Sequence, residues 1–134
     1  MEILEKYNLV INGENLNTNL PIKDENYYST DIFRCILSQN SMPWRIRSID
    51  MLEIHKMQKD IRGNYFFTSD SGFVFVQKSE CIVYDIFSSM DAAEAGGVDE
   101  TGDIATPLFR LPTNDFVEIL ETWARHLEKK ESLF

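Results

Sequence analysis

The apolar positions in the middle of the chain fall into three short runs separated by turn residues. The runs occupy residues 65–68, 73–76 and 81–87, and aromatic and β-branched side chains dominate each of them. The connections between the runs are only a few residues long, so neighbouring strands must be antiparallel. The pattern therefore predicts an antiparallel meander.

Apolar residues at helical spacing predict two helices. The clearer one lies in the last part of the chain, where Thr113 is the expected N-cap and Asp115 lies in the first turn. A second helix is expected near residues 30–39, with Ser29 as its N-cap and Pro43 beyond its end. The apolar stripe of the last helix consists of Phe116, Ile119, Leu120, Trp123 and Leu127.

The remaining segments have weaker patterns. Residues 9–11 form a short apolar run before an Asn-Gly pair, which predicts a strand followed by a turn. Residues 14–28 are polar and predict a surface loop. Residues 44–57 fit neither the helical nor the strand period, and a strand around 52–55 is the favoured interpretation.

These elements predict an α+β fold. A meander of about four to five antiparallel strands, including a further short strand at 107–111, is expected to pack against the C-terminal helix and the helix near residues 30–39. A chain of 134 residues is expected to form a single domain, residues 1–134. Nine Phe, five Tyr and two Trp provide enough large apolar side chains for a core.

Charge is distributed unevenly along the chain, whose net charge is −9. Residues 80–109 contain seven acids and no Lys or Arg, whereas residues 32–79 carry seven bases against four acids. The part of the acidic segment from 88 to 105 is longer than most loops of compact domains, and such loops are commonly functional. The candidate partner-binding residues are Asp85, at the polar side of the third strand, and Asp91, Glu94, Asp99, Glu100 and Asp103.

Two interpretations of this acidic segment stay open. A solvated loop that serves only solubility accounts for the charge. A docking surface for a cationic protein also accounts for it, because acidic surfaces speed association with basic partners. A nuclease is a natural partner of this kind, since its cleft must be basic to hold phosphates. The same charge argues against nucleic acid or an anionic membrane as a direct partner.

The sequence contains none of the common catalytic or ligand-binding motifs. There is no CxxC, HExxH, GxSxG, P-loop or GxGxxG pattern, and only two His occur. We therefore expect no cofactor, no metal site and no enzymatic activity, with an enzyme whose pocket comes from distant residues as the alternative. Cys35 and Cys81 are expected to be buried free thiols. The start of the chain lacks the pattern of a signal peptide, and no apolar run has the length of a membrane helix, so a cytoplasmic location is expected.

The runs GNYFFTSDSGFVFVQKSECIVYDIFS and PLFRLPTNDFVEILETWARHLEKK together resemble bacterial immunity proteins of contact-dependent growth inhibition and related polymorphic toxin systems. The resemblance covers residues 60–130 and is carried by composition and layout. It implies a non-enzymatic protein that binds a cognate toxin domain, often a tRNA-cleaving RNase, and occludes its active site or an adjacent surface. A small adaptor or chaperone that binds another protein through a sheet edge or the C-terminal helix is the alternative.

Overall fold

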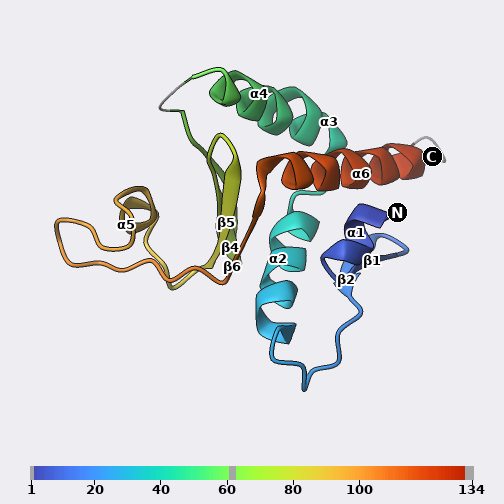
Figure 1. Cartoon of the computed structure of the whole chain (residues 1–134). Helices are drawn as coiled ribbons and strands as arrows, with labels where there is room; N and C mark the ends of the chain where they lie inside the picture. Colours follow the sequence, from blue (N-terminus) through green and yellow to red (C-terminus); the bar gives the residue numbers. More distant parts are fainter. Residues whose placement is uncertain (1, 61–62, 132–134) are drawn as a thin grey trace.

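Helix α6 (Thr113–Glu131) runs through the centre of the computed structural model, which describes residues 2–60 and 63–131. Figure 1 shows α2 (Tyr27–Gln39) and α4 (Leu52–Gln58) on opposite sides of α6, with a sheet beside its N-terminal end. Within the described residues, every helix is too short or too polar to span a lipid bilayer. The α+β architecture predicted from the sequence is confirmed.

The predicted meander is a four-stranded antiparallel sheet in the order β3-β4-β5-β6. The third strand ends at Asp85, two residues earlier than predicted, because the Asp85 carboxylate accepts a hydrogen bond from the Phe87 N–H at 3.0 Å and turns the chain. The predicted strand at 107–111 is β6, in which Phe109 pairs with Val83. The strands are β3 (Tyr65–Ser69), β4 (Gly72–Val76), β5 (Glu80–Asp85) and β6 (Phe109–Pro112).

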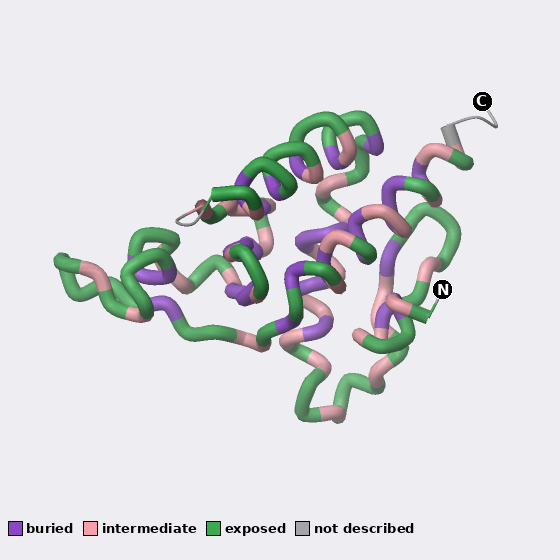
Figure 2. Tube along the Cα trace, turned by 45° about the horizontal axis from the view of Figure 1, so that its top comes forward, coloured by how far each residue is buried: buried purple, intermediate pink, exposed green. Residues whose placement is uncertain are grey.

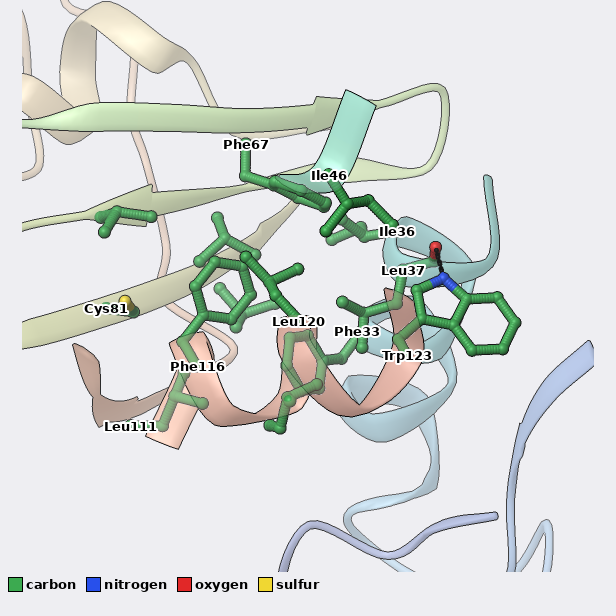
Figure 3. Close-up of a cluster of buried hydrophobic side chains, with 14 of the residues drawn as sticks. Phe33, Ile36, Leu37, Ile46, Phe67, Cys81, Leu111, Phe116, Leu120 and Trp123 are labelled. Carbon is green, nitrogen blue, oxygen red and sulfur yellow. Dashed lines mark hydrogen bonds between the residues drawn. The ribbon is translucent and has the colours of Figure 1, made fainter. Parts of the chain in front are cut away.

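The main core lies between the inner face of this sheet and the helices α2 and α6 (Figure 3). All five residues of the predicted α6 stripe are buried. Trp123 is fully buried, and its indole N–H donates to the carbonyl oxygens of Leu37 at 3.0 Å and Asn40 at 3.1 Å, where α2 ends. The α6 stripe therefore serves packing. The sheet contributes Phe67, Val74, Val76, Cys81, Val83 and Leu111 to this core.

The ends of the two predicted helices differ from expectation in detail. Helix α2 begins at Tyr27 with Asn26 at the cap position, so the predicted N-cap Ser29 lies inside the first turn. Helix α6 begins at Thr113, whose hydroxyl donates to the Gln77 carbonyl oxygen at 2.7 Å. That bond ties the start of α6 to the turn between β4 and β5.

The N-terminal segment forms a short helix and a separate hairpin. Helix α1 (Glu2–Lys6) precedes β1 (Leu9–Asn12) and β2 (Asn15–Thr18), which pair antiparallel around the predicted Asn-Gly turn. The first strand is confirmed, but the prediction of a loop over residues 14–28 is wrong where β2 lies. Strand β2 has one apolar residue, Leu16, and it is specified by pairing with β1 and by complete burial of that side chain.

The favoured strand around residues 52–55 is wrong, because residues 43–58 are helical. The segment consists of α3 (Pro43–Arg45), a π-helical turn η1 (Ile46–Met51) and α4. Its buried side has helical spacing, but one of the buried positions is an aspartate, which hides the period. Several apolar residues of the segment, including Trp44, lie on the exposed side. The buried positions are Pro43, Ile46, Asp50, Ile54 and Met57.

Asp50 carries a buried carboxylate that has too few hydrogen-bond partners. The residue is 4% exposed, one carboxylate oxygen accepts from the Tyr65 hydroxyl, and the other has no hydrogen-bond partner. Burial raises the pKa of Asp50, and the hydrogen bond from Tyr65 opposes that shift only in part. A raised folded-state pKa means that this group stabilises the fold below the unfolded pKa of about 4, and that the contribution is lost as pH rises through the folded value.

We expect Asp50→Asn to become more stable relative to the parent protein as pH rises from 4 to 7. The difference at pH 7 is expected to be about 1 kcal/mol, since a buried charge with an unpaired oxygen is replaced by a neutral amide. Urea unfolding of both proteins across this pH range measures the difference. A parent protein that instead gains stability over the variant with rising pH would contradict the assignment.

Candidate protein-binding site

The acidic loop, defined as residues 86–106, connects β5 to β6. Figure 1 shows it extending from the sheet away from α2 and α6. It contains no Lys or Arg, and it includes the short helix α5 (Met90–Glu94). Five of the six predicted site residues lie on this loop: Asp91, Glu94, Asp99, Glu100 and Asp103.

The acidic loop is packed onto the outer face of the sheet. Ala92, Ala93 and Ala105 of the loop belong to a second hydrophobic cluster, separate from the main core. Figure 2 shows that this loop, although mostly exposed, contains short buried stretches. The rings of this cluster stack in pairs, with centroid separations of 4.9 Å for Phe66–Phe75 and for Phe73–Tyr84. The sheet residues of this cluster are Phe66, Phe73, Phe75, Ile82 and Tyr84.

Backbone hydrogen bonds hold the two limbs of the loop together. The Ser89 hydroxyl caps α5 by accepting from the Ala92 N–H at 3.1 Å, and the Ala105 N–H donates to the Gly97 carbonyl oxygen at 2.9 Å. Gly97 has a φ of 135°, a conformation that residues with a side chain rarely adopt. Gly97 therefore has a conformational role in the loop.

Asp99 organises the tip of the loop. One of its carboxylate oxygens accepts from the Thr101 hydroxyl at 2.7 Å, from the Thr101 N–H at 2.9 Å and from the Asp103 N–H at 2.9 Å. These hydrogen bonds, led by the one from the Thr101 hydroxyl, lower the pKa of Asp99. The carboxylate is thereby kept ionised and is engaged in holding the loop.

Asp85 lies at the base of the loop, apart from the other five acids. Besides the bond from the Phe87 N–H, its carboxylate accepts from the Tyr28 hydroxyl at 2.9 Å, which ties the end of β5 to α2. Asp85 is therefore a structural anchor in the fold. The side chains that the loop presents outward are those of Asp91, Glu94, Glu100 and Asp103, all of which are exposed.

The loop also exposes large apolar side chains, which the sequence analysis missed. Phe87 is 84% exposed, and four aliphatic or Met side chains accompany it. The loop therefore exposes both acids and apolar side chains. Aromatic residues and Met are enriched at protein interfaces, where apolar side chains form the centre of the contact. The exposed apolar residues are Ile86, Phe87, Met90, Val98 and Ile104.

Metal ligation and thiol chemistry can both be judged from the residues that the structure describes. Asp99, Glu100 and Asp103 do not gather as ligands, since the described residues contain no group of three or more side chains suited to a metal ion. Both cysteines are free, and Cys81 is buried while Cys35 is half-buried. Burial raises the pKa of the Cys81 thiol to about 12, which suppresses the reactive thiolate.

Comparisons with protein-family models, with curated proteins and with solved structures give no match to this chain. The function has to be inferred from the surface itself. The acidic loop is the candidate, because it combines uncompensated charge, exposed apolar side chains and an internally bonded backbone.

Proposed function

We propose that the protein is an immunity protein. It binds a cognate bacterial toxin domain, a basic nuclease of the tRNA-cleaving kind, and occludes the active-site cleft of that domain with the acidic loop. The observation that supports this best is the composition of the loop surface, which carries four exposed acids and five exposed apolar side chains and has no base. Its site of action is the cytoplasm, where such a nuclease finds its substrate.

The two kinds of side chain on the loop have different tasks in this proposal. The carboxylates steer the cationic toxin domain and raise the rate of association. The apolar side chains, Phe87 above all, supply the contacts that slow dissociation. The internal hydrogen bonds of the loop limit the entropy lost on binding, because the backbone is already ordered.

Two alternatives fit the surface less well. Solubility alone requires charge, but it does not require a phenylalanine that is 84% exposed among the acids. An adaptor that binds through the C-terminal helix needs a free apolar face on α6, whereas the stripe from Phe116 to Leu127 is buried in the core. The acidic loop is therefore the favoured contact surface.

Neutralising three exposed acids of the loop is expected to slow toxin binding. The triple variant Asp91→Asn, Glu94→Gln, Glu100→Gln should lower the association rate constant about tenfold at low salt and weaken its salt dependence. These side chains take no part in the hydrogen bonds that hold the loop, so the fold should be unchanged. Stopped-flow mixing with the toxin domain at several salt concentrations measures both effects.

A matched control removes the same charge elsewhere. Glu5, Glu25 and Asp70 are exposed acids outside the loop, and Glu5→Gln, Glu25→Gln, Asp70→Asn changes the net charge by the same amount. This control should keep most of the association rate. If both triple variants slow binding equally, overall charge rather than the acidic loop directs association, and the proposed surface is wrong.

A further inference from the structure

An open groove of about 460 Å³ lies between the acidic loop and the outer sheet face. Phe75, Ile82 and Tyr84 of β4 and β5 line it on the sheet side, and Ala93 and Ala105 line it on the loop side. These parts of the wall are apolar, and the rest of the groove is lined by polar or charged side chains, among them Glu80, Glu94 and Arg110. The groove is therefore suited to the hydrocarbon part of a side chain or small ligand.

Tyr84 brings an unused polar group to this groove. The residue is only 3% exposed, and its ring is held by stacking on Phe73. Its hydroxyl makes no hydrogen bond to another described residue, and Tyr84 is one of the residues that line the groove. Buried polar groups normally have a partner, and a hydroxyl left free at such a position points to a ligand that supplies one.

The mouth of the groove carries more negative than positive charge. Glu94 is exposed and unpaired on the loop side. On the sheet side, Glu80 pairs with Arg110, at 3.2 Å between a carboxylate oxygen and Nη1. Two carboxylates face one guanidinium, and Asp91 adds a further negative charge on α5. Charge complementarity therefore selects a cationic occupant.

We propose that the groove receives an arginine side chain of the toxin domain, an inference that rests on the proposed function. The aliphatic stem lies against Ile82 and Ala93. The guanidinium donates to the Glu94 carboxylate and to the Tyr84 hydroxyl oxygen. Arginine suits this site better than lysine, because its planar, weakly hydrated group packs against aromatic rings while donating several hydrogen bonds.

Arg110 gives this proposal a distinctive consequence. Its guanidinium lines the same groove, repels an incoming cation and competes with it for Glu80. Arg110→Gln should therefore strengthen arginine binding. An anionic ligand would show the reverse, because Arg110 would then be the group that recognises it.

The test is an NMR titration of the full chain with N-acetyl-arginine methylamide. We expect saturable amide shifts centred on Ile82, Tyr84 and Glu94, with millimolar affinity. The control probe is N-acetyl-citrulline methylamide, which has the same shape without the charge and should bind several-fold more weakly. Absence of a saturable shift, or equal binding of the two probes, overturns the proposal.

Variants of the groove extend the test. Tyr84→Phe and Glu94→Gln should each weaken arginine binding several-fold, and both keep the shape of the side chain so that the fold is retained. Weaker binding by Arg110→Gln overturns the proposal. A toxin domain that still binds through the acidic loop while arginine does not enter the groove also overturns it and leaves the proposed function intact. Arginine binding without any toxin binding overturns the proposed function alone.

Discussion

Replacing Trp123 by alanine is expected to lower the free energy of unfolding by about 3–5 kcal/mol. The side chain is fully buried between α2 and α6, and it donates to the carbonyl oxygens of Leu37 and Asn40 at the end of α2. The variant loses the packing of the indole and leaves these oxygens without their donor. Urea unfolding followed by circular dichroism measures the loss.

The second tryptophan is the matched control for this experiment. Trp44 is 64% exposed on α3, so Trp44→Ala should change the free energy of unfolding by less than about 0.5 kcal/mol. Trp123→Phe keeps an aromatic ring in the core and removes only the donor, which separates packing from hydrogen bonding. Similar costs for Trp123→Ala and Trp44→Ala would show that α6 does not pack as described.

Replacing Phe87 by alanine is expected to weaken the complex with the toxin domain by about 2–4 kcal/mol, while the free energy of unfolding stays within about 0.5 kcal/mol of the parent value. Phe87 is 84% exposed on the acidic loop, so a partner that covers the loop would bury it. Its backbone N–H still donates to Asp85 in the variant, which preserves the turn after β5. Calorimetric titration and urea unfolding give the two energies.

Trp44→Ala also serves as the control for binding, because it removes an exposed aromatic side chain from a helix outside the acidic loop. It should leave the affinity for the toxin domain unchanged. An effect on affinity as large as that of Phe87→Ala would move the contact surface to α3 and α4.

The sheet and α6 are predictable from the sequence because their patterns are local. The runs around Tyr65, Phe73 and Cys81 and the stripe of α6 each carry their own period. Residues 43–58 escaped prediction because Asp50 occupies a buried position of the helix, which breaks the apolar period. Strand β2 was not predicted, because its own residues are almost all polar and the strand is defined by its pairing with β1.

The candidate site is predictable only in its charge. The absence of bases from the acidic segment is visible directly, but the sequence does not separate acids that present a surface from acids such as Asp85 and Asp99 that accept internal hydrogen bonds. Exposed Phe87 is likewise indistinguishable in sequence from core phenylalanine.

The sequence of β4 does contain a signal for the loop's position. This strand has apolar residues on both faces, from Phe73 to Val76, which indicates a strand covered on both sides. The acidic loop packs on the outer face of β4, while the main core covers its inner face.

The central claim is that the acidic loop binds and blocks a basic toxin domain, and hydrogen exchange of the complex tests it most directly. The partner to test is a basic toxin domain encoded by a gene adjacent to that of this protein. We predict that one equivalent of the protein abolishes the nuclease activity and that amides of residues 86–106 gain protection in the complex. Unchanged nuclease activity, or protection confined to surfaces outside the acidic loop, would contradict the proposal.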